Sequence, residues 1–460
     1  MSFHGADRSV TGSCHLVECA GKRILIDCGL YQGSRELDEE NAEPFGFDAA
    51  GIHYVLLTHA HLDHCGRLPL LAKRGFRGEV ITTSASRELT RLVMLDAAYL
   101  LEEDARHRGR RGGHGGANND TKNPLYSTLD ALNCLDNFGR TAAYSESLEV
   151  TAGVNATFLD AGHILGSASI FLQLSEQGHS TNVLFSGDLG NAGRQLLRSP
   201  VTPPRTENVV METTYGDRLH KPLGPSIAEL FEAINETFKR GGNVIIPTFA
   251  VERAQELLYF LGEGIRKGQL AESTQVFLDS PMAISATEIF RRHPECFEPA
   301  TAKLFQGTHD PFDLPGLHFT RESAESVALN NIHGGAIIMA GSGMCTGGRV
   351  RHHLQHNLGR DKSAVVFVGY AATGTLARRI IDGAKQVKIF GEDVPVRARI
   401  YTINGFSAHA DQAELLAWQR HTGAKRTFLV HGEQDSMRAL AAHLADAGIE
   451  MPIQNQSFDL

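Results

Sequence analysis

Thr58-His59-Ala60-His61-Leu62-Asp63-His64 is the most informative stretch of this 460-residue chain. It places three imidazoles and a carboxylate within six consecutive positions, directly after the apolar run Tyr54-Val55-Leu56-Leu57. A buried strand that ends in such a cluster delivers several metal ligands to one point. Histidine and carboxylate ligands without a thiolate suit zinc, and a mixed set suits a pair of ions. The pattern therefore favours a metal centre over a chance histidine-rich loop.

Further carboxylates and histidines follow other apolar stretches at Gly-rich or polar turns. These stretches are 23–29 with Asp27, 159–163 with His163, 182–188 with Asp188 and 426–431 with His431. Functional groups of sheet proteins gather on loops at one edge of the strands, so these side chains should converge. The expected ligand sets are His59, His61, His163 and Asp188 for one ion, and Asp63, His64, Asp188 and His431 for the other. Asp188 can serve both ions because a carboxylate has two oxygens.

The middle of the chain has a different pattern, in which strands alternate with helices. Strands are predicted at 243–247, 275–278, 336–339 and 364–368, and a helix at 253–266. This alternation implies parallel pairing and a separate α/β layer. The chain is therefore of the α/β class, and its length suggests two or three domains.

Composition narrows the class of protein. No apolar run is long enough to span a bilayer, and the seven cysteines without a C-x-x-C pair indicate reduced thiols in a cytoplasmic protein. The net charge of -9 argues mildly against a general polyanion binder. Arg106–Arg111 is nevertheless a compact basic run inside a Gly/Asn-rich segment that extends to about Asn123. A nucleic-acid contact and a mobile solvated loop both remain open for that segment.

The chain resembles the β-CASP subgroup of the metallo-β-lactamase-fold hydrolases, which are RNA-processing nucleases. That subgroup contains the endonuclease subunit of the cleavage and polyadenylation factor and its short bacterial relatives. Seven motifs match in order: Asp27, the 59–64 cluster, His163, Asp188, Glu212 in Met211–Gly216 (motif A), His409 in Gly405–Asp411 (motif B) and His431 in Val430–Glu433 (motif C). The match covers nearly the full length.

The resemblance implies an αββα sandwich into which an α/β β-CASP domain is inserted. The expected boundaries are 1–208 for the first part of the metallo-β-lactamase domain, 209–404 for the β-CASP domain and 405–460 for the completing part. The metals would lie at the floor of a cleft between the two domains. A histidine in motif C points to the RNA-directed branch of the subgroup. RNA selectivity would come from these two domains or from self-association as a homodimer.

The expected chemistry is hydrolysis with two Zn²⁺ ions per chain, which lower the pKa of a water molecule and clamp phosphate oxygens. His409 is the expected proton donor to the leaving oxygen, with Glu212 holding its ring. Asp27 would orient ligand histidines and could accept the proton of the attacking water. Asp63 is counted both as a metal ligand and as a catalytic residue.

A glycine-rich loop, Gly341-Ser342-Gly343-Met344-Cys345-Thr346-Gly347-Gly348-Arg349, follows the strand at 336–339. Small residues let backbone N–H groups approach a phosphate, so Ser342 and Gly343 are predicted to contact the RNA backbone. A mere tight turn is the alternative. Ser407 of motif B is a further predicted substrate contact. Arg253 is another, although it could equally be a structural anchor.

Three functional classes compete. The favoured one is a ribonuclease for single-stranded RNA, endonucleolytic with 5′-to-3′ exonuclease activity as a second mode. A hydrolase of small thioesters or lactones on the same scaffold would leave residues 209–404 without a purpose. A non-catalytic RNA-binding relative is disfavoured because every expected ligand position is filled.

Overall fold

The computed structural model describes residues 1–33, 39–111, 123–306, 310–369, 371–372, 374–444 and 448–460. They form two compact units, which are described separately. The first unit comprises Met1–Gly193, Ser199–Leu219 and His409–Leu460, and the second comprises Arg194–Arg198 and His220–Ala408. All predicted metal ligands belong to the first unit, and all predicted substrate contacts belong to the second.

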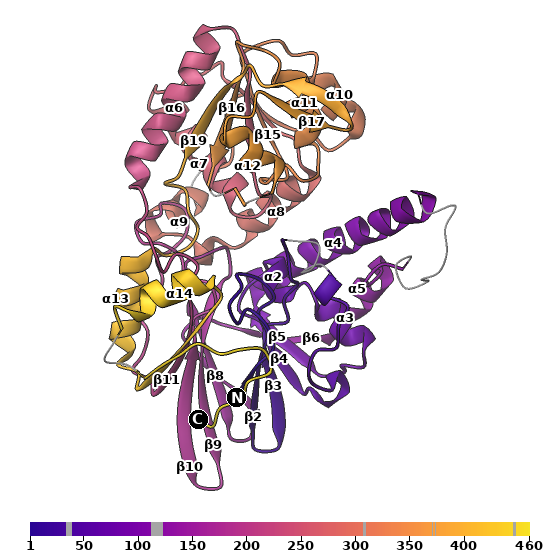
Figure 1. Cartoon of the computed structure of the whole chain (residues 1–460). Helices are drawn as coiled ribbons and strands as arrows, with labels where there is room; N and C mark the ends of the chain where they lie inside the picture. Colours follow the sequence, from indigo (N-terminus) through magenta and orange to yellow (C-terminus); the bar gives the residue numbers. More distant parts are fainter. Residues whose placement is uncertain (34–38, 112–122, 307–309, 370, 373, 445–447) are drawn as a thin grey trace. The chain divides into compact units, whose positions relative to one another are not determined.

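Two facing sheets form the centre of the first unit (Figure 1). One contains, in spatial order, β1 (Ser2–Phe3), β2 (His15–Cys19), β3 (Lys22–Ile26), β4 (Tyr54–Leu56), β5 (Glu79–Thr83) and β6 (Phe138–Ala142). The other contains β21 (Gly448–Glu450), β20 (Arg426–Val430), β11 (Asn208–Glu212), β10 (His179–Phe185), β9 (Ala168–Glu176), β8 (Val154–Asp160) and β7 (Ser147–Thr151). Their apolar side chains, among them Ile24 and Phe158, meet in one buried core.

Helices cover the outer sides of both sheets, which completes the predicted αββα sandwich (Figure 1). The described helices of the first unit are η1 (Ala49–Gly51), α2 (Leu62–Cys65), α3 (Leu68–Lys73), α4 (Ser84–Arg111), α5 (Thr128–Cys134), η3 (Leu135–Asn137), α13 (Gln412–Thr422) and α14 (Gln434–Ala441). Trp418 of α13, Met437 of α14 and Leu429 of β20 belong to a second buried core. Asp411 caps the N-terminus of α13 by accepting a hydrogen bond from the Glu414 N–H, so the residues just before this helix are held in place.

The basic run Arg106–Arg111 differs from the prediction, because it forms the end of α4 and not a loop. The helix is built largely from Leu, Ala, Glu and Arg, which are strong helix formers. Arg106 also pairs with Glu102 and Glu103, about one turn earlier. The rest of the Gly/Asn-rich segment, residues 112–122, lies outside the described residues.

The second unit is built on a six-stranded sheet in which every neighbouring pair is parallel, as the sequence predicts. Its spatial order is β14 (Leu317–Phe319), β13 (Gln275–Leu278), β15 (Ala336–Ala340), β12 (Val244–Pro247), β16 (Ala364–Val368) and β19 (Arg399–Ile403). The described helices are α6 (Leu223–Lys239), α7 (Arg253–Arg266), α8 (Pro281–Arg292), η4 (Pro294–Cys296), α9 (Pro299–Gln306), α10 (Ser323–Leu329), α11 (Val350–Asn357) and α12 (Leu376–Ile381). A separate hairpin joins β17 (Gln386–Ile389) to β18 (Glu392–Pro395). The expected boundaries at residues 208 and 404 remain predictions.

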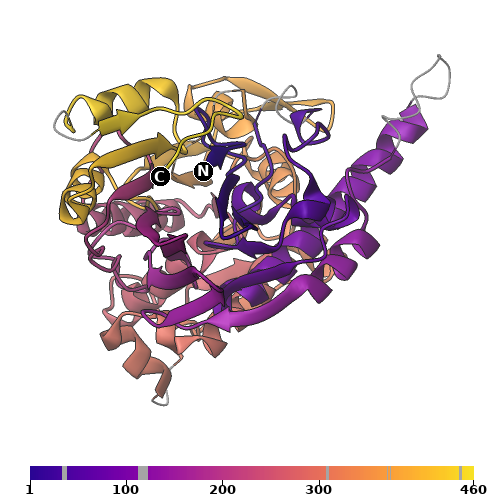
Figure 2. The same ribbon diagram turned by 90° about the horizontal axis from the view of Figure 1, so that it is seen from below.

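The two chain ends lie side by side in the first unit (Figure 2). The amino group of Met1 donates a hydrogen bond to the carbonyl of Phe458 over 2.8 Å. Across the described part of the chain, no helix is both long and apolar enough to cross a membrane.

Candidate metal centre

Four side chains converge where β4, β8 and β10 end. The Nε2 atoms of His59 and His163 lie 3.2 and 3.1 Å from Nδ1 of His61. The Oδ2 atom of Asp188 lies 3.5 Å from Nε2 of both His59 and His163. One ligand atom from each of the four residues falls within 4.8 Å of the others. Three imidazoles and a carboxylate at such distances fit a divalent ion such as zinc.

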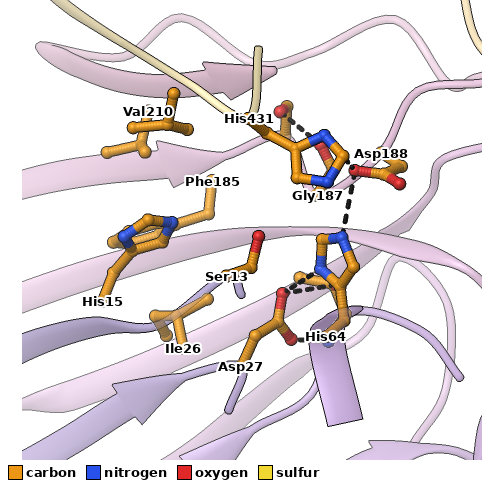
Figure 3. A pocket seen from close by; sticks show the side chains of 13 residues that line it. Ser13, His15, Ile26, Asp27, His64, Phe185, Gly187, Asp188, Val210 and His431 are labelled. Atoms are coloured by element: carbon orange, nitrogen blue, oxygen red, sulfur yellow. Dashed lines mark hydrogen bonds and ion pairs between the residues drawn. The ribbon is translucent and has the colours of Figure 1, made fainter. Parts of the chain in front are cut away.

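A second cluster lies on the other oxygen of the same aspartate (Figure 3). Oδ1 of Asp188 is 3.2 Å from Nε2 of His64 and 3.4 Å from Nδ1 of His431. The Nε2 atom of His431 lies 3.5 Å from Oδ2 of Asp63. Asp63, His64 and His431 offer atoms within 4.8 Å of one another. The two oxygens of Asp188 therefore face two different histidine sets, which is the arrangement that a shared ligand requires.

Three buried atoms of the second cluster have no hydrogen-bond partner among the described residues: Nε2 of His64, Oδ1 of Asp188 and Nε2 of His431. Buried polar groups are nearly always satisfied, so such atoms need an explanation. A cation is a suitable partner for such atoms, and His64 and His431 already share one group of possible metal ligands with Asp63. The donor set thus fits a metal ion.

The charge states of His59, His61 and Asp188 suit metal binding. For His64, in contrast, burial is outweighed by the carboxylates of Asp188 and Asp27, which raise its pKa well above its usual value. Burial lowers the pKa of His59 well below its usual value, and it lowers the pKa of His61 as well. Both rings are therefore neutral near pH 7 and offer a lone pair. Burial acts to raise the pKa of Asp188, but the neighbouring His431 and His64 outweigh it and hold that pKa well below its usual value. The shared carboxylate is accordingly ionised.

Asp27 follows β3 and contacts the cluster from behind. Its Oδ2 atom lies 2.7 Å from Nδ1 of His64, which turns Nε2 of that ring toward Asp188. Thr58 donates to Asp27 twice, from its N–H over 2.7 Å and from its hydroxyl over 2.8 Å. These are the contacts that the orienting role of Asp27 needs. Sequence reasoning assigned no role to Thr58, although a hydroxyl residue directly before the histidine cluster was a visible signal.

His409 and Glu212 form a pair at the edge of the cluster. Glu212 ends β11, is fully buried and accepts a hydrogen bond from the Leu189 N–H over 2.6 Å. Both of its oxygens lie 3.3 Å from Nδ1 of His409. Burial acts to lower the pKa of His409, but the Glu212 carboxylate outweighs it and raises that pKa to about 9. The imidazolium form is therefore favoured at neutral pH.

The predicted substrate residues belong to the second unit, whereas the ligand sets belong to the first. Ser342 and Gly343 begin the loop between β15 and α11, where the Ser342 carbonyl accepts from the Cys345 N–H over 3.0 Å. Ser407 is half-buried near the end of the unit. Arg253 is buried at the start of α7 and pairs with Glu256. This ion pair favours the structural role for Arg253 over a substrate contact.

Asp279, which the sequence reasoning did not select, holds the glycine-rich loop at its far end. It is fully buried, and its Oδ1 atom accepts from the Arg349 guanidinium over 2.7 Å. Its Oδ2 atom lies 2.6 Å from Nε2 of His353 and accepts from the Ser326 hydroxyl over 2.6 Å. Burial opposes its ionisation, but His353, Ser326 and Arg349 outweigh burial and lower its pKa. Asp279 thus joins the loop to the first turns of α10 and α11.

Asp279→Asn should lower the free energy of unfolding by about 2–4 kcal/mol, because it leaves the buried His353 and the partly exposed Arg349 without their anion. The chemical-denaturation midpoint at pH 7 measures the loss.

Because the pKa of Asp279 is lowered by folding, its stabilisation is present above about pH 4 and is lost as the pH falls through the folded value. The difference in the free energy of unfolding between the wild type and Asp279→Asn should therefore become smaller in acid. Asp382→Asn is the control, since this carboxylate pairs with Arg378 at the surface; equal losses in both variants would contradict the role of Asp279.

A sandwich that presents histidines and carboxylates at one strand edge is typical of a metal-dependent hydrolase. Three family models match the chain: the metallo-beta-lactamase superfamily over residues 8–248, the Beta-Casp domain over 254–380, and the Zn-dependent metallo-hydrolase RNA specificity domain over 393–453. The chain belongs to the β-CASP group of the metallo-β-lactamase superfamily.

The relatives agree with this assignment. The chain is 41% identical to ribonuclease TTHA0252 of Thermus thermophilus, over 98% of this chain and 96% of the relative. It is 32% identical to the transcription termination factor FttA of Methanocaldococcus jannaschii, over 94% of this chain and 67% of the relative. A crystal structure of a protein of unknown function from Enterococcus faecalis shares the fold, with a TM-score of 0.55 and 12% identity over 99% of this chain and 98% of that one.

Proposed function

We propose that this chain is a zinc-dependent ribonuclease that hydrolyses phosphodiester bonds of single-stranded RNA. The observation that carries the proposal is the position of Asp188 between two histidine sets, with the protonated His409 beside them. The full-length similarity to a relative named a ribonuclease supports RNA as the substrate. The proposed ligands are His59, His61, His163 and Asp188 for one ion. Those for the other ion are Asp63, His64 and His431, together with Asp188 through its second oxygen.

Each side chain has a distinct task in this proposal. Two zinc ions held by these ligands would lower the pKa of a water molecule and neutralise charge on the phosphate oxygens. Asp27 fixes the orientation of His64, and Thr58 fixes Asp27. Glu212 holds Nδ1 of His409, so Nε2 is the nitrogen that carries the proton for the leaving ribose oxygen.

The glycine-rich loop is the proposed contact for the RNA backbone. The N–H groups of Gly343 and Met344 make no hydrogen bond to any described residue, whereas that of Cys345 is used within the loop. Two adjacent backbone donors of this kind suit a phosphate oxygen. Ser342 and Ser407 would add hydroxyl donors to the same strand of RNA.

We expect cleavage of a single strand to be clearly faster than cleavage of the same strand in a duplex, with little sequence preference. The proposed ligands are recessed, since His59 and His163 are fully buried and Asp188 is 1% exposed. A flexible strand can bring its phosphate to such a site, but an A-form duplex is too stiff and wide. Cleavage maps of several unrelated 5′-labelled RNAs, alone and annealed, measure this. Equal cutting of the duplex, or cutting at one strict motif, would contradict it.

The same maps separate the two proposed modes of cleavage. Internal products at early times indicate the endonuclease that we propose as the main mode, whereas short products from the 5′ end indicate 5′-to-3′ trimming. Sedimentation of the zinc-loaded protein tests the proposed homodimer.

A further inference from the structure

A pocket lies at the carboxyl edge of the parallel sheet in the second unit. Its lining includes Phe249 after β12, Gly343 after β15, and Val368 and Gly369 at the end of β16. These three strands are neighbours in the sheet, in the order β15-β12-β16. Ligands of open parallel sheets bind in the crevice outside the carboxyl ends of the strands. The position of this pocket therefore suits a ligand.

Phe249 presents an aromatic ring to solvent at this pocket, with 48% of its surface exposed. A phenylalanine gains stability from burial, so an exposed ring on a rigid element is a candidate contact surface. The backbone beside it is fixed, because the Thr248 N–H donates to the Ala340 carbonyl over 3.0 Å. The ring is therefore held at the end of the sheet and does not sit on a long loop.

Gly343 brings the glycine-rich loop against this ring. A Cβ atom at position 343 would lie only 2.9–3.2 Å from three ring carbons of Phe249. The missing side chain lets the backbone approach the ring, and the unbonded N–H groups of Gly343 and Met344 lie in the same stretch. An aromatic face next to backbone donors is the combination that holds a base and its phosphate in single-stranded RNA.

We propose that Phe249 and the glycine-rich loop form a nucleotide subsite, in which one base of single-stranded RNA stacks on the ring while its phosphate contacts the loop. The subsite rests on the proposed ribonuclease function and adds a base contact that this function does not require. Because every base has a π face, the contact is tolerant of sequence. The exposed Phe249 ring supplies an apolar face for a base, and the backbone N–H groups of Gly343 and Met344 beside it supply polar contacts for the phosphate.

The test is equilibrium binding of a fluorescein-labelled, hydrolysis-resistant phosphorothioate oligouridylate to the zinc-loaded protein, followed by anisotropy. Phe249→Ala should weaken binding about 10-fold, the loss of one base–aromatic stack. Phe249→Tyr should restore it. Phe390→Ala is the matched control, since Phe390 is 47% exposed in the same unit and lies away from the pocket; it should bind like the wild type.

A series of oligonucleotides with one abasic ribose at successive positions locates the contact. The wild type should bind the oligonucleotide about 10-fold more weakly when the abasic ribose is at one particular position. Phe249→Ala should show no further loss of affinity when that same base is removed. Equal binding by Phe249→Ala and Phe390→Ala, or additive losses at every abasic position, would overturn the subsite. If the subsite fails this test but the wild type still cleaves RNA, the proposed ribonuclease function stands. If Phe249→Ala weakens binding as expected but the wild type does not cleave RNA, only the ribonuclease function is rejected.

Discussion

His409→Ala is expected to slow RNA cleavage by about a hundredfold to ten-thousandfold, the range for loss of a positioned general acid. His409 meets Glu212 through Nδ1 and has a pKa of about 9, so it carries a proton when the leaving oxygen needs one. It belongs to neither of the proposed ligand sets. Its removal should therefore leave the zinc content unchanged.

His431→Ala is the matched comparison, because it removes a histidine of the second cluster. That variant should lose both activity and metal. Metal analysis of the two purified variants alongside single-turnover cleavage separates the roles. If His409→Ala lost zinc to the same degree as His431→Ala, the proton-donor assignment would be wrong.

Asp188→Asn is expected to remove essentially all activity and to lower the metal content from two zinc ions per chain to below one. The two oxygens of this carboxylate lie 3.2–3.5 Å from the nitrogens of four histidines in two sets. An amide lacks the negative charge and offers only one oxygen acceptor, so it cannot serve both ions as the carboxylate does.

Metal analysis after zinc supplementation and dialysis measures this outcome. Asp96→Asn on α4 is the control, since it removes a carboxylate from the same unit but from no ligand set. Two ions retained by Asp188→Asn would contradict a shared aspartate. One ion in the wild type would contradict the two-metal proposal.

Local patterns were enough to predict the strands and their polar ends. β16 and β13 match the predicted bounds, and α7 spans the predicted Arg253–Arg266, because apolar runs and turn residues mark these elements locally. The convergence of His163 and Asp188 on the 59–64 cluster followed from one rule, that such residues collect at a single strand edge.

Contacts between distant segments could not be predicted in this way. The hydrogen bonds that join Asp279 to Arg349 and His353 connect residues about 70 positions apart in the sequence, and no local pattern encodes such contacts. Phe249 has an apolar side chain of the kind that usually lies in a core, and its exposure follows from its place at the edge of the sheet. Arg106–Arg111 was interpreted from the glycines that follow it, whereas the helix formers that precede it determine its structure.

The most direct measurement incubates the purified protein with 5′-labelled single-stranded RNA, with and without a chelator, beside single-stranded DNA and a generic thioester. We expect cleavage of the RNA, loss of cleavage with the chelator, recovery on addition of zinc, and little turnover of the thioester. RNA cleavage that persists after verified metal removal, or turnover of the thioester with no cleavage of RNA, would contradict the proposed zinc-dependent ribonuclease activity.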